Sequence, residues 1–448
     1  MKITIYSLPQ HGHVNPTLAL AQELTRRGHS VTYYLTEEFR EKVENVGGIF
    51  RPLGTTPDIY AEARRAVNAA RNGGGLSPGG ALRVFITFMA RTMARLDELR
   101  EELVADDPDL IIYDPMSLWG NILARNGDRP RVTFYTTYPR IAGDAMSGRM
   151  AVMFARALSP RIAPDVLRLA GSLVKARLAG LRVPVSPESL FTSKEALNLV
   201  PLPRSMLPNE AQLDGTHLFF GPNLMLGYAH QGEPLPEVTP GKRLYVSMGS
   251  TPLNNQPGLF AAVIEGFGDS EWKVIMNVGE ADGRALGPVP SNIVVRNYVP
   301  QIAVLEHHAD VFLTHGGMNS VMESCYFGVP MMVLPLQQET QITARQVEAK
   351  GLGKSLDPSE VTGGRLRAVA EGVLGDVTLR QNLQVLQQEL RTCGGARQAA
   401  DAVEAYVTPP TRNGSSRPGA GPSGPGAGRR ATGGWFRRHS SWPGPTSQ

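Results

Sequence analysis

A chain of 448 residues is too long for one ordinary hydrophobic core, so its length predicts two domains of about 200 residues each. Apolar residues make up 42% of the chain and charged residues 19%, which is typical of a globular protein and excludes a largely disordered one. Of the 45 Lys and Arg residues, six lie in 409–448, which leaves 39 against 41 acidic residues. Because this near-neutral part carries no basic excess, we expect no nucleic-acid partner.

Cysteine usage and apolar patterning indicate where the protein works. Cys325 and Cys393 are too few for a disulfide framework and have no metal-site spacing, which favours a reducing, cytoplasmic location. The apolar run at the N-terminus ends at Pro9, which is too short and too early for a signal peptide. No uninterrupted apolar stretch is long enough to span a bilayer. We therefore expect a cytoplasmic monomer or weak dimer without a membrane span.

Strand-like and helix-like segments alternate in the N-terminal half. The apolar runs predict strands at 2–8, 30–35, 109–113 and 131–135, with helices at 15–27 and 37–46 that stop at glycines. This alternation predicts a parallel sheet with helices on both faces. The segment 140–181 is rich in Met, Leu and Ala and has no clear strand, so we expect helices added to the sheet. Those helices either wall an apolar pocket or belong to the core.

A proline-rich stretch separates this half from a second one with the same alternation. It predicts a linker over 206–240, after a first domain of 1–205. Strand-like runs then recur at 244–248, 273–277, 293–296 and 310–314. We expect a second domain over 241–385, a helical segment over 386–407 that packs back on the first domain, and a disordered Gly/Pro/Ser/Arg tail over 408–448. The fold class is α/β, with two doubly wound domains facing a central cleft.

The strongest local signal is the run Thr314-His315-Gly316-Gly317-Met318-Asn319-Ser320. It joins a predicted strand to a helix, and Asn319 or Ser320 can cap that helix. Exposed N–H groups and the dipole at a helix start favour a phosphate. Glu323 lies one turn beyond Asn319, where a carboxylate can accept bonds from both hydroxyls of a ribose. A Gly-rich turn followed by a solvated Glu remains the alternative for this run taken alone.

With its continuation, the run resembles a known family signature. The continuation comprises Glu323, Gly328-Val329-Pro330, Pro335 and Glu339. The whole resembles the inverting GT-B glycosyltransferases of family 1, which include macrolide and plant secondary-metabolite enzymes. Three further segments resemble that family, and they are Gln10-His11-Gly12-His13-Val14-Asn15-Pro16, Tyr245-Val246-Ser247-Met248-Gly249-Ser250 and Tyr298-Val299-Pro300-Gln301. The resemblance runs from Met1 to about Val407.

The resemblance implies a role for each matching residue. His13 would be the general base that deprotonates the acceptor hydroxyl, and Asp114 would orient it. Tyr298 would stack on the nucleobase, in a segment that also contains Gln301, and the Val299 backbone would bond the edge of the base. The remaining donor-binding residues are Glu323 for the ribose, Ser250, His315, Gly317, Asn319 and Ser320 for the phosphates, and Glu339 and Thr340 for the sugar.

The order of the predicted elements independently supports the pair of His13 and Asp114. Each follows a strand of the same parallel sheet, so both side chains can emerge at the edge where such sheets bind ligands. A neutral imidazole is a suitable base near physiological pH, and a carboxylate partner fixes its tautomer. His11 is the rival base, two residues away. Without the family motif, a lone loop histidine would more often be a polar contact only.

One short acidic segment has the form of a metal-binding motif. Asp107-Pro108-Asp109 has the Asp-x-Asp form by which another glycosyltransferase fold class binds a divalent ion. It precedes a predicted strand, on the side away from the expected cleft. The helix start at Asn319 can meet the charge of the leaving group without a cation. We therefore expect no metal and no cofactor beyond the nucleotide sugar co-substrate.

The predicted function is inverting transfer of a sugar from a UDP- or dTDP-sugar to a hydroxyl of a small natural product such as a macrolide, polyketide or phenolic. One alternative is a GT-B enzyme acting on a lipid or a nucleotide sugar. Another is a catalytically silent homologue that serves as a partner protein. An oxidoreductase is poorly supported, because no Gly-x-Gly-x-x-Gly follows the first strand.

One departure from the family pattern concerns the sugar. After Pro335 the family usually has an acidic residue followed by Gln, whereas this chain has Glu339-Thr340. The shorter Thr340 suggests a donor other than plain glucose, such as a deoxy or 2-acetamido sugar. Alternatively, Gln341 or Gln338 bonds the same hydroxyls.

Overall fold

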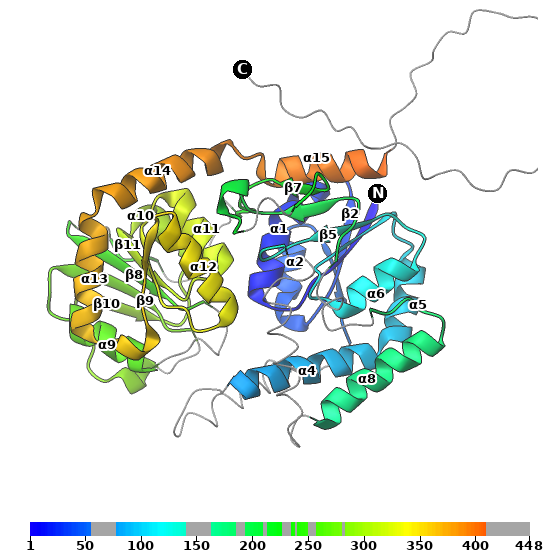
Figure 1. Ribbon diagram of the computed structural model, residues 1–448, viewed down its shortest axis with the longest axis horizontal. Coiled ribbons are helices and arrows are strands. Elements are labelled where there is room, and N and C mark those ends of the chain that lie inside the picture. The colour runs from blue at the N-terminus through cyan, green and yellow to red at the C-terminus, as the bar shows by residue number, and fades with distance from the viewer. Residues whose placement is uncertain are drawn as a thin grey trace, which may run out of the picture. The chain divides into compact units, whose positions relative to one another are not determined.

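The structure is a computed structural model. It describes residues 1–54, 78–139, 163–184, 193–208, 213–225, 234–237, 240–249, 257–279 and 283–408, and the statements below concern these residues. Residues 1–407 form one compact unit, and within it two separate parallel sheets are covered by helices (Figure 1).

The first sheet contains seven parallel strands in the order β3-β2-β1-β4-β5-β6-β7. Its register is continuous across the centre, where Thr4 on β1 lies between Thr32 on β2 and Ile111 on β4. The strands are β1 (Lys2–Tyr6), β2 (Ser30–Leu35), β3 (Ile49–Pro52), β4 (Leu110–Tyr113), β5 (Arg131–Phe134), β6 (Asn198–Val200) and β7 (His217–Phe219).

The second sheet contains six parallel strands in the order β10-β9-β8-β11-β12-β13. Its strands are β8 (Lys242–Ser247), β9 (Trp272–Asn277), β10 (Ile293–Arg296), β11 (Val311–Thr314), β12 (Met331–Val333) and β13 (Gly353–Ser355). In both sheets the chain winds outward in one direction and then returns to the centre to wind in the other. This is the doubly wound topology, with its reversal between β1 and β4 and again between β8 and β11.

Helices cover both faces of these sheets (Figure 1). The helices that accompany the first sheet are α1 (His11–Arg26), α2 (Arg40–Asn45), α4 (Pro78–Ala94), α5 (Leu96–Asp106), α6 (Leu118–Asn126) and α8 (Ala163–Leu178). The described helices later in the chain are α9 (Pro257–Phe267), α10 (Gln301–His307), α11 (Met318–Phe327), α12 (Gln338–Ala349), α13 (Gly363–Gly375), α14 (Val377–Thr392) and α15 (Gly395–Val407). None of these described helices combines the length and apolar character needed to cross a bilayer.

Alternate residues of each strand pack into different cores. On β4, Leu110 and Ile112 join the core that includes α1 and α15, whereas Ile111 and Tyr113 join the core beneath α4 and α6. The second sheet behaves in the same way, since Tyr245 on β8 faces one core and Val246 the other. Such strands are buried on both faces because side chains alternate along a strand and helices cover both sides. This explains their continuous apolar runs.

Several predicted boundaries differ from the structure. The first sheet extends to β7, which lies inside the predicted linker of 206–240, and the predicted boundary at 385 falls inside α14. The sequence did not predict β3, β6, β7, β12 and β13: the last four have only three residues each, too few for a readable period, and the apolar start of β3 ends at Arg51. Helix α1 begins at His11 rather than Asn15, so His13 lies in its first turn. Within the predicted tail of 408–448, residues 409–448 lie outside the described residues.

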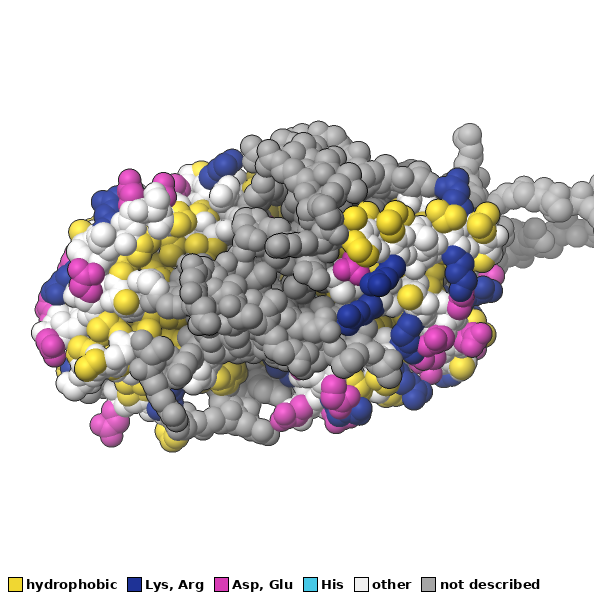
Figure 2. Space-filling view, turned by 90° about the horizontal axis from the view of Figure 1, so that it is seen from below, with side chains coloured by type: hydrophobic (Ala, Val, Ile, Leu, Met, Phe, Trp, Pro, Cys, Tyr) yellow, Lys and Arg dark blue, Asp and Glu magenta, His cyan; other side chains and the backbone are white. Residues whose placement is uncertain are grey.

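The predicted helical region of 140–181 is described from residue 163 onward and contains α8. Helix α8 packs along α4 and turns Leu167, Val174 and Leu178 outward, with 57–84% of each side chain exposed. Figure 2 shows apolar side chains next to Lys and Arg side chains on the face seen from below. A pocket of about 560 Å³ lies between α4, α5 and α8, lined by small, apolar and charged residues. None of the predicted site residues lines this pocket.

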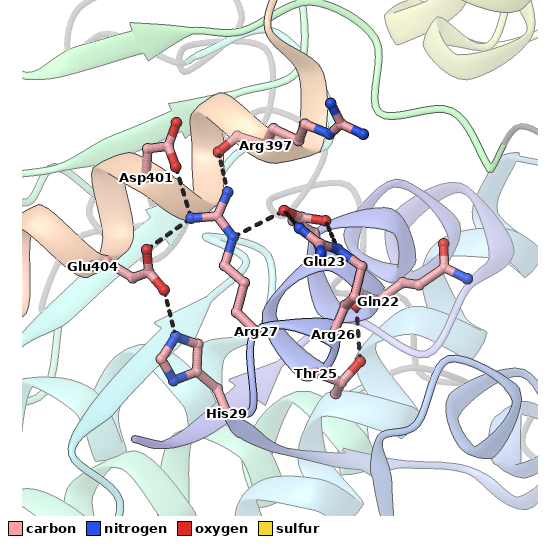
Figure 3. A network of polar contacts seen from close by, with 9 residues as sticks. All are labelled: Gln22, Glu23, Thr25, Arg26, Arg27, His29, Arg397, Asp401 and Glu404. Atoms are coloured by element: carbon pink, nitrogen blue, oxygen red, sulfur yellow. Dashed lines mark hydrogen bonds and ion pairs between the residues drawn. The ribbon is translucent and has the colours of Figure 1, made fainter.

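The last helix lies against the first domain, where the chain returns after α14 (Figure 1). Ala399, Ala400 and Val403 of α15 are buried in the core that contains α1. A polar network reinforces this contact (Figure 3), centred on Arg27 just after α1. Its guanidinium donates to Asp401 and Glu404, at 2.7 Å each, and to Glu23 at 2.9 Å. The hydrogen bond from His29, with those from Arg27, holds the pKa of Glu404 below its usual range.

Arg27→Met should lower the free energy of unfolding by about 1–3 kcal/mol, because it leaves the nearly buried Glu23 and the α15 carboxylates without a shared partner. Arg26→Met is the matched control. Arg26 also binds Glu23 but has 66% of its side chain exposed, so solvent screens this pair and its loss should cost less than the loss of Arg27. Denaturant titration of both variants measures the difference. Equal losses would show that the contact with α15 adds nothing to stability.

Candidate active site

The predicted site residues gather where the two sheets reverse their strand order. In the first sheet His13 follows β1 and Asp114 follows β4, its neighbour. In the second sheet Gly249 follows β8 and His315 follows β11, again on adjacent strands. Open parallel sheets bind ligands beyond the carboxyl ends of their strands at these reversal points. Both halves therefore present their polar residues at the edge where such sheets bind ligands.

His13 and Asp114 are in direct contact. Their Nδ1 and Oδ2 atoms are 2.5 Å apart, and the side chains are 13% and 2% exposed. The other carboxylate oxygen, Oδ1, accepts the backbone N–H of Met116 at 2.8 Å, which orients the carboxylate. An ionised carboxylate only accepts hydrogen bonds, so Nδ1 carries the hydrogen and Nε2 has the lone pair. This is the tautomer that a general base of this kind requires.

The rival base, His11, has different surroundings. Its Nδ1 lies 3.1 Å from the Lys42 ammonium, and its ring packs 5.0 Å from the ring of Phe39. The same ammonium lies 3.2 Å from the Asn15 amide oxygen. An ammonium can only donate hydrogen bonds, whereas a carboxylate can only accept them. His11 Nδ1 therefore faces a donor, and His13 Nδ1 faces an acceptor. This contrast favours His13 as the base.

Asn319 links the second half of the chain to the helix that carries His13. Its Nδ2 donates to the Gly12 carbonyl at 3.0 Å. That carbonyl is free to accept because Pro16, four residues later, has no N–H to complete the helical bond. Neither Asn319 nor Ser320 caps α11, contrary to prediction. The N-cap is Gly317, because the helix begins one residue before Asn319.

His315 is held between two glycines. A Cβ added to Gly249 would lie 2.6 Å from the ring atom Cε1, and one added to Gly317 would lie 2.5 Å from Nε2. Gly249 also has a φ of +77°, which L side chains rarely adopt. Burial lowers the pKa of His315 to about 4, so the ring is neutral. Its Nδ1 is buried without a partner among the described residues, as expected of an atom that serves a ligand.

Gln301, the first residue of α10, connects that helix to α11. Its Nε2 donates to Glu323 at 2.5 Å and to Ser320 at 3.1 Å, and its Oε1 accepts from Tyr245 at 3.3 Å. Burial raises the pKa of Glu323 to about 7, although the Gln301 bond acts in the opposite direction. The carboxylate is therefore only partly ionised at neutral pH before a ligand binds.

The other donor-binding predictions occupy varied positions. Tyr298 is 65% exposed, as a residue that stacks on an incoming base has to be, and Val299 is buried in the core. Thr340 is 6% exposed, and its hydroxyl bonds both the N–H and the carbonyl of Gln337 at the start of α12. The Thr340 hydroxyl therefore forms its hydrogen bonds within the start of α12, and we do not expect it to bond the sugar directly. Ser250 lies outside the described residues, as does the side chain of Gln338.

The two carboxylates of the Asp-x-Asp segment have structural partners. Asp107 pairs with Arg129, and Asp109 accepts the backbone N–H of Lys2 at 2.8 Å. The segment lies at the amino end of β4, the opposite end from Asp114. Among the described residues, no three His, Cys, Asp or Glu side chains cluster closely enough to bind a metal ion.

His13 has a further polar contact, with a residue that the sequence did not single out. Thr136 Oγ1 lies 2.8 Å from His13 Nδ1, on the same side of the ring as Asp114. Thr136 follows the predicted strand of 131–135, which becomes β5 next to β4. Its place at the carboxyl end of a neighbouring strand was the available signal, but a lone threonine carries too little chemical information to be singled out.

Comparisons with known proteins found a matching family and similar enzymes. Residues 261–402 match the family described as Erythromycin biosynthesis protein CIII-like, C-terminal domain. Over 410 residues the chain is 33% identical to the NDP-glycosyltransferase YjiC of Bacillus licheniformis, covering 91% of this chain and 98% of that protein. The chain belongs to the GT-B glycosyltransferases of family 1. It is also 31% identical to the demethyllactenocin mycarosyltransferase of Streptomyces fradiae, with 91% and 87% of the two chains covered.

Solved structures of glycosyltransferases have the same fold. The glycosyltransferase of kitacinnamycin superposes with a TM-score of 0.71 at 30% identity, over 91% of this chain and 99% of the other. The calicheamicin glycosyltransferase CalG4 gives a TM-score of 0.68 at 27% identity, over 91% and 98%. The predicted GT-B fold and the prediction of a glycosyltransferase are both confirmed.

Proposed function

We propose that this glycosyltransferase moves a sugar from a uridine or thymidine diphosphate sugar to a hydroxyl of a small natural product, with inversion at the anomeric carbon. The contact between His13 Nδ1 and Asp114 Oδ2 carries the proposal. Nε2 of His13 removes the proton of the acceptor hydroxyl, and its oxygen attacks the anomeric carbon. The bond to the diphosphate breaks on the opposite face, so no covalent enzyme intermediate forms.

The donor domain supplies the groups that meet the leaving diphosphate. The first N–H groups of a helix lack helical acceptors, and α11 begins at Met318, shortly after the carboxyl end of β11. The side-chain donors in this proposal are His315, whose Nδ1 has no partner among the described residues, the amide of Asn319, and the hydroxyls of Ser250 and Ser320. These donors stabilise the growing negative charge on the diphosphate without a cation. We therefore propose metal-independent transfer.

The nucleoside lies across the segment that joins β10 to α10. The exposed Tyr298 stacks on the base, and the Val299 backbone bonds its edge. Glu323 accepts the ribose hydroxyls, while Gln301 keeps the carboxylate in place. Glu339 bonds the sugar. Because the Thr340 hydroxyl is used at the helix start, the choice of sugar depends more on Glu339 and its neighbours than on a direct bond from Thr340.

The names of the relatives, rather than a pocket among the described residues, indicate the class of acceptor. One relative is named for demethyllactenocin, and the oleandomycin glycosyltransferase of Streptomyces antibioticus is 28% identical over 407 residues. We propose a macrolide, polyketide or phenolic hydroxyl as the acceptor. Much of the region expected to line the acceptor pocket lies outside the described residues.

The test incubates the enzyme with UDP- or dTDP-sugars and a panel of macrolide and phenolic acceptors. Mass spectrometry should show one added sugar per acceptor, with release of one nucleoside diphosphate and no loss of activity in a chelator. NMR of the product should show the anomeric configuration opposite to that of the donor. A retained configuration would contradict direct displacement. Nucleotide binding, seen as a raised melting temperature, without any transfer would support a catalytically silent homologue.

A further inference from the structure

His13 has two oxygen neighbours on one edge of its ring. Asp114 Oδ2 lies 2.5 Å from Nδ1, and Thr136 Oγ1 lies 2.8 Å from the same atom. The three side chains follow the adjacent strands β1, β4 and β5, so the sheet itself brings them together. Thr136 is only 4% exposed, and its hydroxyl is thereby withdrawn from bulk water.

The chemistry of these atoms determines the direction of the contacts. The carboxylate has no hydrogen to give, so the hydrogen between Nδ1 and Asp114 belongs to Nδ1. An Nδ1 that carries a hydrogen has no lone pair left in the ring plane. Thr136 Oγ1 can therefore only accept, and the Nδ1–H is shared between the two oxygens.

Two hydrogen-bond acceptors restrict the orientation of the His13 ring more than one acceptor does. The torsion that turns a histidine ring about its Cβ–Cγ bond has a broad energy minimum, so a single contact allows the ring to pivot. The second oxygen comes from a different strand and narrows that range. A small misorientation of a general base is costly, because proton transfer requires the nitrogen within hydrogen-bond reach of the hydroxyl.

We propose that Thr136 is a positioning residue, which orients the His13 ring so that Nε2 points at the acceptor hydroxyl. It acts on His13 through the shared Nδ1–H. The inference rests on the proposed function of His13 as the base. It adds a third side chain to the His13 and Asp114 pair.

Thr136→Val removes the hydroxyl and keeps the shape of the side chain, whereas Thr136→Ser keeps the hydroxyl. We expect the valine variant to lose about five- to tenfold in kcat, since one hydrogen bond is worth about 1 kcal/mol. The KM for acceptor and the affinity for UDP or dTDP should stay within about twofold. The serine variant should keep at least half of the wild-type kcat. Thr32→Val, a similar exchange on β2 of the same sheet, should leave kcat unchanged.

Melting temperatures separate positioning from folding. If Thr136→Val unfolds, Thr136→Ala takes its place and should show the same loss in kcat. A valine variant with more than half of the wild-type kcat would overturn the inference, as would a serine variant that loses as much as the valine variant. Parallel measurement of His13→Ala keeps the two proposals apart. An active His13→Ala contradicts the proposed function itself, whereas an inactive one beside a normal Thr136→Val contradicts the role of Thr136 alone.

Discussion

His13→Ala should lower kcat by roughly a hundred- to ten-thousand-fold, the usual contribution of a general base. Alanine cannot take the acceptor proton, and Asp114 has its Oδ2 turned toward the ring that is lost. Nucleotide affinity should be almost unchanged, because the residues proposed to bind the nucleotide belong to the second half of the chain. Initial rates with saturating donor, together with calorimetric titration of UDP or dTDP, measure both quantities.

Two companion variants sharpen this result. His11→Ala is the matched control, because it removes the rival imidazole from the same helical turn and should retain most of the turnover. Asp114→Asn should show a milder loss than His13→Ala, since it disturbs the orientation and charge of the base without removing it. If His13→Ala keeps more than a tenth of the wild-type turnover, or if His11→Ala is the inactive variant, His13 is not the base.

Glu323→Ala should weaken nucleoside diphosphate binding at least tenfold. A charge-assisted hydrogen bond to a ribose hydroxyl is worth about 1.5–3 kcal/mol, and alanine also leaves Gln301 without its acceptor. Isothermal titration with UDP and dTDP gives the affinity. Glu339→Ala is a useful comparison, because it should impair the use of the nucleotide sugar while sparing the free nucleotide. Unchanged affinity in Glu323→Ala would exclude Glu323 from the nucleotide site.

The raised pKa of Glu323 should make the stability of the free enzyme depend on pH near neutrality. Its pKa of about 7 exceeds the ordinary value of 4.5 because burial disfavours the charge. A raised folded-state pKa means that the protonated side chain favours the fold below about pH 4.5, and that this advantage is lost as the pH rises through 7. The melting temperature of the free enzyme should therefore fall between pH 5 and 8 by more than that of Glu323→Gln.

Nucleotide binding should show the opposite pH trend. Ribose hydroxyls donate to the carboxylate, so the nucleotide binds the ionised form and its affinity should rise through pH 7. Glu323→Gln, which cannot ionise, should lose this increase. An equal pH dependence in both proteins would show that another group is responsible.

Most residues of the proposed donor site could be singled out from the sequence, because they lie close together along the chain. The run from Thr314 to Ser320 contains a strand end, two glycines and a helix start, and local geometry follows from such a pattern. Several strands were equally accessible. The predicted bounds of 30–35 and 293–296 coincide with β2 and with β10, the edge strand of the second sheet, since both are largely apolar runs.

The three-residue edge strands could not be predicted from the sequence. β7 and β13 have three residues each, and their neighbours in the sheet rather than their own sequence make them strands. The proline-rich surroundings of β7 indicated a linker, although the prolines lie outside the paired residues.

Composition and local pattern determined the fold class, the central strands and the family motifs, because each depends on residues within a few positions of one another. Only the tertiary structure decided how distant residues meet. His13 contacts Asp114 across 101 positions and Thr136 across 123, and Asn319 contacts the Gly12 carbonyl across 307. Such contacts depend on which strands become neighbours and on which carbonyl a proline leaves unpaired. The sheet order sets the first. The start of α1 at His11 sets the second, because it includes Gly12 in the helix, and Pro16 lacks the N–H that would otherwise donate to the Gly12 carbonyl.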